Sequence, residues 1–305
     1  MTPNLEKKLP AEWVVPKPES GWHTQAALAD DWAACKEVTR EHATSFFFAS
    51  FPLPEAKKRA AYAIYALCRW CDDIIDEGEG NDNPPEKSRL LKELDAIEAG
   101  KSSLPFARAV NEVNHQYAIP RVFWEDLIEG VCMDRQSVII HRYEELEVYC
   151  YHVASVVGLI MSKVFGLSDP AGVPHAVDMG IAMQLTNILR DVLEDFLKGR
   201  IYLPLDEMRE YNTGPEAIAA KRINNQEWDA FMQMQVDRAN KHYRSAEIGL
   251  SYLANDGSRF TTKLMSRVYG GILGEIEKNK LNVFAGRLYV PTWKKVLIAL
   301  NAVMR

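Results

Sequence analysis

Residues 61–77 read AYAIYALCRWCDDIIDE, and this stretch decides the fold. Its apolar residues are too dense for a surface helix, so we expect a helix that is buried in the core until the acids begin. Asp72 and Asp76 are four residues apart and therefore share one face of that helix. Oxygen ligands of this kind suit Mg²⁺, which typically takes one or two carboxylates together with substrate phosphates. The stretch therefore predicts a buried helix that ends in a site for a divalent cation.

A second acidic row lies in residues 184–195, which read QLTNILRDVLED. Its polar members recur every four residues, so they share one face of a helix whose other residues are mostly apolar. Buried polar groups need hydrogen-bond partners, and this row therefore indicates a polar pocket inside a bundle of helices. Two such rows facing each other would hold Mg²⁺ around a diphosphate. The predicted metal ligands are Asp72, Asp76, Asn187, Asp191 and Asp195.

Helical periodicity continues through the rest of the chain, while period-2 alternation and βα patterns are scarce. This pattern predicts an all-α fold, a single-domain helical bundle around a central cavity. Residues 1–25 hold four prolines among charges and are expected to be a loose extension, whereas 26–305 form the helical domain. We expect helices at 26–42, 59–77, 87–98, 104–117, 121–135, 144–165, 173–198, 216–220, 225–253, 258–280 and 291–304.

Composition excludes several classes of function. A formal charge of −6 argues against nucleic-acid binding as the main role. An odd number of cysteines and no secretory signal predict reduced thiols in the cytoplasm. The longest apolar stretch, 153–165, is interrupted by Ser155, Ser162 and Lys163 and is shorter than the roughly 18 residues of a membrane span. Because substrate and product of the reaction inferred below are very apolar, we expect peripheral membrane association only.

Several segments, taken in order, resemble the squalene/phytoene synthase family. The two acidic rows resemble its first and second signatures, and the second continues into GRIYLP at 199–204. YCYHVA at 149–154 is similar to the tyrosine-bearing central segment, and HATSF at 42–46 to the N-terminal motif. Residues 269–291 resemble the C-terminal block. The first signature and the YCYHVA segment look most similar to those of bacterial phytoene synthases.

One position departs from the usual family pattern. Ser155 follows Val-Ala where much of the family has glycine, and presqualene diphosphate synthases also carry serine there. This departure leaves a C30 synthase as the alternative, acting on farnesyl diphosphate to give presqualene diphosphate, dehydrosqualene or squalene.

The resemblance implies an isoprenoid-synthase-like fold and a Mg²⁺-dependent prenyltransferase of carotenoid biosynthesis. Such an enzyme joins two geranylgeranyl diphosphates head to head (1′-1) through prephytoene diphosphate to give phytoene. Mn²⁺ is expected to substitute for Mg²⁺. NADPH is not expected, because no G-x-G-x-x-G follows a strand. A catalytically silent helical scaffold is disfavoured because the acids of both rows are present. The oligomeric state stays open.

Candidate substrate-binding residues fall into two chemical groups. Guanidinium groups match phosphate oxygens, and aromatic faces stabilise a carbocation. Tyr149 and Tyr151 are both catalytic candidates, since a tyrosine of this segment steers the final proton loss, and which of the two faces the cation stays open. Ser45 is expected either to contact phosphate or to cap a helix. Asp134 is expected to contact the residues that bind the substrate without touching the substrate itself, and His152 is expected to have a packing role. The other candidates are Arg69, Arg190, Arg200 and Arg287 for phosphate, Phe46, Phe47, Tyr65 and Phe165 for the cation, and Gln184 and Tyr269.

Chain length is the last expectation. If Phe46 faces the prenyl channel, Ser50 lies one helical turn deeper along the same wall. A small side chain there leaves room for a further isoprene unit, so the sequence favours C20 over C15 substrates.

Overall fold

The computed structural model describes residues 26–76, 85–134, 137–221, 226–284 and 286–303, so the predicted extension 1–25 lies outside the described residues. Within these ranges the chain is helical, with two isolated β-bridges and no strands. The all-α prediction is confirmed, while the single-domain organisation of 26–305 stays a prediction. The helices are α2 (Ala29–His42), α3 (Thr44–Ala49), α4 (Glu55–Asp76), α5 (Pro85–Glu98), α6 (Ala107–Gln116), α7 (Arg121–Met133), α8 (Tyr143–Cys150), α9 (Val156–Phe165), α10 (Val173–Leu197), α11 (Leu205–Glu210), α12 (Pro215–Ala219), α13 (Gln226–Gly249), α14 (Ser258–Lys278) and α15 (Thr292–Val303).

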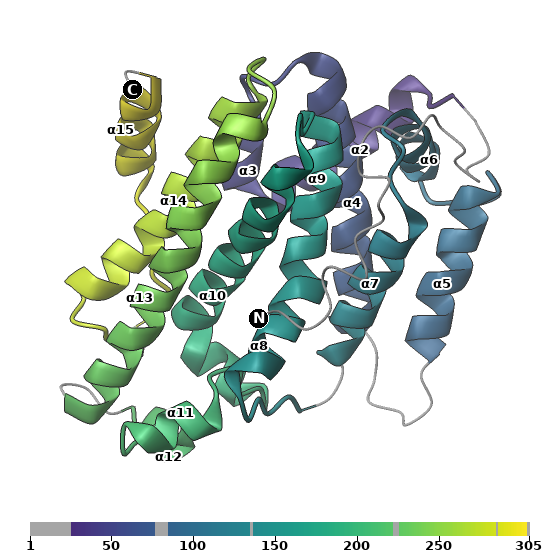
Figure 1. Ribbon diagram of the computed structural model, residues 1–305. Helices are drawn as coiled ribbons and strands as arrows, with labels where there is room; N and C mark the ends of the chain where they lie inside the picture. The colour runs from purple at the N-terminus through teal and green to yellow at the C-terminus, as the bar shows by residue number, and fades with distance from the viewer. Residues whose placement is uncertain (1–25, 77–84, 135–136, 222–225, 285, 304–305) are drawn as a thin grey trace.

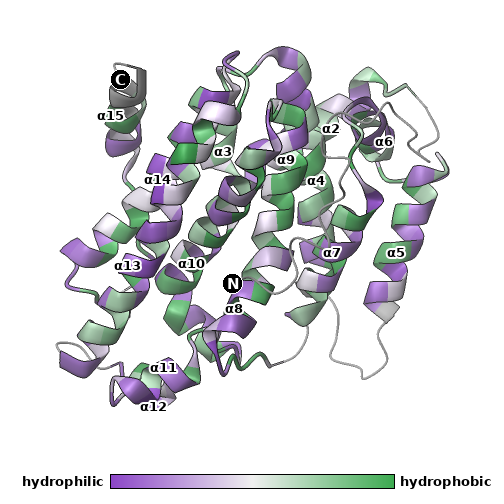
Figure 2. Ribbon diagram, viewed as in Figure 1, coloured by the Kyte–Doolittle hydropathy of each residue, from purple (hydrophilic) through white to green (hydrophobic). Residues whose placement is uncertain are grey.

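Helices α9 and α10 lie at the centre of the bundle (Figure 1). Helices α13 and α14 pack on one side of them, and α4 and α7 on the other. Hydrophobic residues concentrate on the central helices, whereas the outer ones are more polar (Figure 2). This distribution follows from burial, because a helix packed on several sides has few positions left for polar side chains.

The segment Tyr143–Phe165 forms one continuous helical rod. It consists of α8, a π-helical turn at Tyr151–Ser155, and α9, which ends at Gly166 in the left-handed conformation (φ 79°) that glycine adopts without strain. The rod is long and apolar enough to cross a membrane, so the expectation that no segment reaches that length was wrong. Since 61% of its most apolar window is buried inside the protein, we interpret it as a core helix.

Helix α10 is the longest element and is not straight. Asp191 has φ −104° and ψ 15°, which are outside the helical range and mark a kink inside the helix. The four-residue spacing of Asn187, Asp191 and Asp195 therefore does not lie on one regular helix.

The predicted ranges agree with the observed helices except for short elements. Helix α11 lies outside the predicted helical ranges, and α3 is only six residues long. The residues before α11 are not helical, and Ile201 forms a parallel bridge with Ile139.

Candidate active site

A cavity of about 350 Å³ lies between the central helices and is lined mostly by apolar side chains. Helix α4 contributes Tyr65 and Cys68, and α13 contributes Ala246 and Gly249. Helix α9 lines it from Val157 to Phe165. Helix α10 borders the cavity over four successive levels at helical spacing: Asn187, then Met183 and Gln184, then Met179 and Gly180, then His175 and Ala176.

A second cavity of about 260 Å³ is polar. It is lined by cationic and anionic side chains together with the Tyr149 ring. Val153 and Gln184 line both cavities, so the apolar cavity and the polar cavity adjoin there. The charged residues at the polar cavity are Arg69, Asp72, Asp134 and Arg200.

The first acidic row reaches the polar cavity at its start. Asp72 is exposed and lines the polar cavity. Arg69, one turn earlier on α4, lines it as well and forms an ion pair with Asp73. Asp76 is the last residue of α4, and its side chain is outside the described part of the structure.

The side chains of the second acidic row have different neighbours, and α10 is kinked at Asp191 between them. The Nδ2 of Asn187 donates to Oε1 of Gln184 (3.3 Å), and Asn187 borders the apolar cavity. The Asp191 carboxylate pairs with Arg190 (Nε to Oδ1, 2.8 Å) and with Arg287 (Nε to Oδ1, 3.2 Å). Asp195 lines a third, small cavity with Arg200. The three side chains therefore have different neighbours, although Asp191 is close enough to Asp195 for its charge to raise the pKa of that carboxyl group, and a shared metal site stays a prediction.

The charges of this region favour a cation. Burial, and then the negative charge of Asp191, raises the pKa of Asp195 to about 7. A divalent ion placed near these oxygens would reverse that effect, and Asp72, Asn187, Asp191 and Asp195 offer the oxygen-only donor set that Mg²⁺ prefers. In the described ranges, no group of three or more His, Cys, Asp or Glu side chains stands close enough to hold a metal by itself. The donors therefore fit the metal in type, with substrate phosphates needed to complete its coordination.

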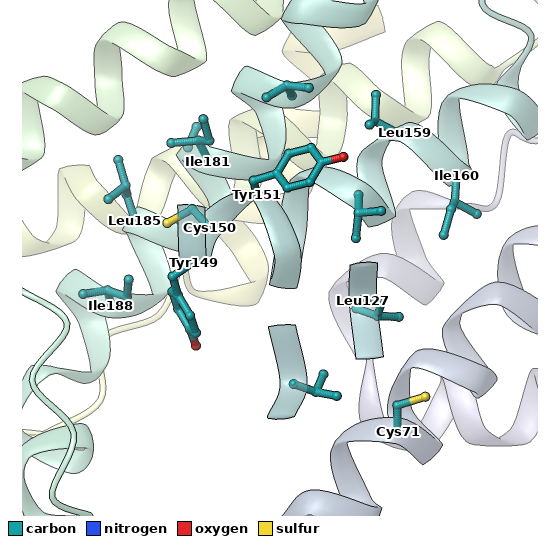
Figure 3. Close-up of a cluster of buried hydrophobic side chains, with 14 of the residues drawn as sticks. Cys71, Leu127, Tyr149, Cys150, Tyr151, Leu159, Ile160, Ile181, Leu185 and Ile188 are labelled. Carbon is teal, nitrogen blue, oxygen red and sulfur yellow. The ribbon is translucent and has the colours of Figure 1, made fainter. Parts of the chain in front are cut away.

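Tyr149 and Tyr151 point in different directions from their helical rod (Figure 3). Tyr149 borders the polar cavity, and its hydroxyl donates to Oδ2 of Asp134 (2.9 Å). Tyr151 turns the other way, and its hydroxyl donates to Oδ2 of Asp126 (3.1 Å). The ring nitrogen Nδ1 of His152 lies 3.0 Å from the Asp126 carbonyl, so His152 packs as expected. Of the two tyrosines, the geometry favours Tyr149 for chemistry.

Tyr202 belongs to this site and was missed as a candidate. Its hydroxyl donates to Oδ1 of Asp134 (2.5 Å), and its ring stacks on Tyr149 with centroids 4.8 Å apart. Arg200 donates to the Asp134 carbonyl (2.7 Å). Burial and the Asp134 charge raise the pKa of both tyrosines. Tyr202 lies in the GRIYLP segment, which resembles a family motif, but the sequence of that segment does not indicate which residue its hydroxyl contacts.

The remaining aromatic candidates divide between cavity and core. Phe46, Tyr65, Phe165 and Tyr269 line the apolar cavity. Burial raises the pKa of Tyr65 to about 12, so its hydroxyl stays a neutral donor at neutral pH. Phe47 is packed against Tyr62 with ring centroids 5.5 Å apart and does not line the cavity in the described residues.

The hydrogen-bond partners of Ser45 and Ser50 differ from those that the sequence predicts. Ser45 makes no capping hydrogen bond for α3, and its hydroxyl accepts from Nζ of Lys295 (2.9 Å). Ser50 is fully buried and hydrogen-bonds the hydroxyl of Tyr62 (2.7 Å) and the carbonyl of Phe47 (2.8 Å). Among the described residues that line the apolar cavity Ser50 does not occur, so the prediction that it lies along the channel wall was wrong. Ser50 caps the C-terminus of α3 and is still helical, but its side chain is buried against Tyr62.

Ser155 is explained by packing. Its hydroxyl donates to the Val177 carbonyl (2.8 Å), and a Cβ placed at Gly180 would come within 2.4 Å of the Ser155 backbone. Position 180, where α10 crosses the rod, therefore requires glycine. The buried Ser155 hydroxyl finds its hydrogen-bond partner in the Val177 carbonyl at the same helix contact.

Comparison with known proteins gives the family. The family model described as squalene/phytoene synthase matches residues 39–294. A 15-cis-phytoene synthase of Synechocystis sp. is 34% identical over 296 residues, which covers 93% of this chain and 87% of the relative. One from Synechococcus elongatus is also 34% identical, covering 92% and 94%. Among solved structures, a dehydrosqualene synthase superposes with a TM-score of 0.82 at 28% identity, covering 90% and 95%. A squalene synthase from Alicyclobacillus acidocaldarius gives 0.76 at 26%, covering 83% and 95%. The chain belongs to the squalene/phytoene synthase family.

Proposed function

We propose that this protein condenses two geranylgeranyl diphosphates to phytoene and releases two diphosphates. The observation that carries the proposal is the adjoining pair of cavities, one apolar and one polar, which share Val153 and Gln184. A prenyl diphosphate has the same division into a hydrocarbon chain and an anionic head. Relatives of similar length that are named phytoene synthases support the C40 product.

The polar cavity receives the leaving groups. Arg69 and Arg200 place guanidinium groups where diphosphate oxygens can accept bidentate hydrogen bonds. Asp72, Asn187, Asp191 and Asp195 would hold the divalent cations, with Asp76 at the end of α4. Bound cations would neutralise the departing diphosphate as Lewis acids. Arg190 and Arg287 hold Asp191 in place, so they reach the phosphates only if that pairing rearranges.

The apolar cavity protects the carbocations. Loss of the first diphosphate leaves an allylic cation, which the double bond of the second chain attacks. Loss of a proton then closes the cyclopropane ring and gives the intermediate, prephytoene diphosphate. A second ionisation, rearrangement and proton loss give phytoene. The rings of Phe46, Tyr65 and Tyr269 face the cavity and can stabilise positive charge while excluding water. At the junction the hydroxyl oxygen of Tyr149 is placed to accept the final proton as it passes its own proton to the Asp134 carboxylate, to which it is hydrogen-bonded.

The experiment is incubation of the pure full-length protein with geranylgeranyl diphosphate or farnesyl diphosphate, Mg²⁺, and NADPH present or absent. We expect phytoene from the C20 substrate without NADPH, and no turnover after chelation by EDTA. Preferential formation of presqualene diphosphate, dehydrosqualene or squalene from the C15 substrate would replace the proposal by the C30 alternative.

We also propose that the protein associates peripherally with membranes through α3 and α15. Phe51, in the turn after α3, is 83% exposed, and Trp293 on α15 is 65% exposed. The two helices belong to one surface, because Ala49 of α3 and Ile298 of α15 pack in the same apolar cluster on α14. Aromatic side chains of this kind partition into the interface of a bilayer.

Flotation with neutral liposomes tests this surface. We expect binding by the wild type and reduced binding by Phe51→Ser with Trp293→Ser. Binding that requires anionic lipid and disappears in moderate salt would contradict the proposal, because polybasic attraction is screened by ions.

A further inference from the structure

The far end of the apolar cavity contains a histidine that no step of the reaction uses. His175 is at the start of α10, whereas Asn187 marks the end of the cavity that adjoins the diphosphate region. The two residues are twelve positions apart, which on a helix corresponds to roughly 18 Å. Both line the same cavity, so the cavity follows α10 from the reacting end to His175.

The cavity levels correspond to the units of the substrate. One helical turn rises by about 5.4 Å, close to the length of one extended isoprene unit. Asn187, Met183, Met179 and His175 mark four successive levels of α10. Four isoprene units of a C20 chain therefore extend to the level of His175. A C15 chain ends one turn earlier, beside Met179.

The His175 ring is held by a chain of partly buried hydrogen bonds. Its Nδ1 lies 2.9 Å from the hydroxyl of Ser245. Ser245 donates its single hydroxyl proton to Oδ2 of Asp178, so the imidazole Nδ1–H must be the donor to Ser245. Asp178 also accepts from Nδ1 of His242 (2.7 Å). Burial alone would raise the pKa of Asp178, yet the hydrogen bonds from His242 and Ser245 lower it, so this carboxylate stays an ionised acceptor.

The surroundings leave the ring little freedom. Tyr252 stacks on it, with centroids 6.2 Å apart and planes 12° apart. On α13, a Cβ placed at Gly249 would lie 2.4 Å from the Cβ of His175, so the helices are in close contact there. Leu167 and Leu253, joined by a β-bridge, complete this end of the cavity. The imidazole is therefore fixed in position, and its close neighbours leave it no room to move aside.

We propose that His175, fixed by Ser245 and Asp178, closes the far end of the apolar cavity and sets the upper limit of prenyl chain length. The proposal rests on the prenyl diphosphate reaction proposed above. In this arrangement His175 contacts only the fourth isoprene unit of the substrate. His175 should therefore affect C20 substrates and longer ones, while C15 substrates do not reach it.

The test measures kcat/KM for C15, C20 and C25 prenyl diphosphates with wild type and three variants. His175→Trp should lower kcat/KM for the C20 substrate at least ~10-fold while the C15 value stays within about 2-fold, since even one methylene changes discrimination by 10-fold or more. His175→Ala should raise kcat/KM for the C25 substrate by ~10-fold or more. His175→Leu, which keeps a similar volume without the hydrogen bond, should keep the wild-type order of substrates.

His141→Trp is the matched control, because His141 is exposed and lies away from the cavity lining. It should behave as wild type. Thermal unfolding is recorded for each variant, and if His175→Trp does not fold, His175→Ala with the C25 substrate decides the question.

Three results would overturn the inference: an unchanged C20/C15 ratio in His175→Trp, no gain of C25 turnover in His175→Ala, or a His175→Leu profile as altered as that of His175→Trp. A wild type that turns over none of the diphosphates would instead refute the proposed reaction itself. The two failures are therefore distinguishable.

Discussion

The polar cavity and the apolar cavity are built by the same helices and yet have opposite chemistry. Helix α4 presents Tyr65 and Cys68 to the apolar cavity and, within one further turn, Arg69 and Asp72 to the polar one. Helix α10 reaches the boundary at Gln184, which borders both cavities. A change of one helical turn along α4 is therefore enough to pass from the hydrocarbon cavity to the diphosphate cavity. We therefore assign the residues at the polar cavity to the diphosphate group and those at the apolar cavity to the hydrocarbon chain of the substrate.

The largest effect is expected in the polar region. Asp72→Asn and Asp191→Asn remove a carboxylate without changing its size. Cation-mediated charge stabilisation is worth several kcal/mol, and we expect kcat to fall by about 10³-fold or more. Steady-state kinetics at saturating Mg²⁺ measures the loss, and circular dichroism checks the fold.

The control for that prediction is Glu194→Gln on the same helix. Glu194 pairs with Lys198 on the surface, and the change should leave turnover near the wild-type rate. Near-normal activity of Asp72→Asn or Asp191→Asn would refute the assignment of the polar cavity as the cation and diphosphate site.

A smaller effect should distinguish the two tyrosines at the boundary. Tyr149→Phe removes the hydroxyl that faces the polar cavity, and we expect kcat to fall ~10²-fold, the usual contribution of a positioned proton-transfer group. Tyr151→Phe removes a hydroxyl that bonds Asp126 away from both cavities, so turnover should stay close to that of the wild type. Product analysis of Tyr149→Phe should show the cyclopropyl intermediate accumulating. Equal losses in both variants would show that the orientation in Figure 3 does not decide the role.

The smallest effect concerns stability at the far end of the apolar cavity. Nζ of Lys57 donates to the Phe165 carbonyl (2.9 Å) and pairs with Asp256 (2.8 Å). Lys57→Met leaves that carbonyl without its donor, and we expect a loss of about 1–3 kcal/mol in the free energy of unfolding. Lys58→Met removes a pair with exposed Glu55 and a cation–π contact with the exposed Phe51 ring, and it should cost about 1 kcal/mol or less. Urea unfolding compares the two variants.

The same pair predicts a pH dependence. Burial opposes ionisation of Asp256, but the hydrogen bonds from Lys57 and Ser258 lower its pKa to about 2. A lowered folded-state pKa contributes stability above the unfolded value near 4, and that contribution disappears as the pH falls towards about 2. The difference between wild type and Lys57→Met should therefore shrink over this range. A difference that stays constant down to pH 2 would contradict the ion-pair explanation.

The sequence predicted the helical class and most helix ranges because the apolar spacing of segments such as 61–75 is unambiguous. It also identified the polar residues of both cavities by type. It could not place them, because each orientation depends on tertiary geometry. Helix α10 is kinked at Asp191, in the middle of the second acidic row. A π-helical turn begins at Tyr151, within the rod that carries both tyrosines.

Ser50 shows the same limit more sharply. Its spacing from Phe46 predicted a shared wall, but the Ser50 side chain is buried and its hydroxyl bonds Tyr62. The far end of the cavity is formed instead by His175, which stands outside the recognised motifs. Tyr202 likewise gained its role only through Asp134, which is distant in sequence. Residues whose function depends on a partner from another element are the ones that sequence spacing does not reveal.

We expect one molecule of substrate to span both cavities. A crystal structure with Mg²⁺ and the non-reactive thiolodiphosphate analogue of geranylgeranyl diphosphate tests this arrangement. The diphosphate should lie beside Arg69, Asp72 and Arg200, and the hydrocarbon chain should follow α10 with its last isoprene unit against His175. A diphosphate bound at the His175 end, or a chain outside the apolar cavity, would contradict it.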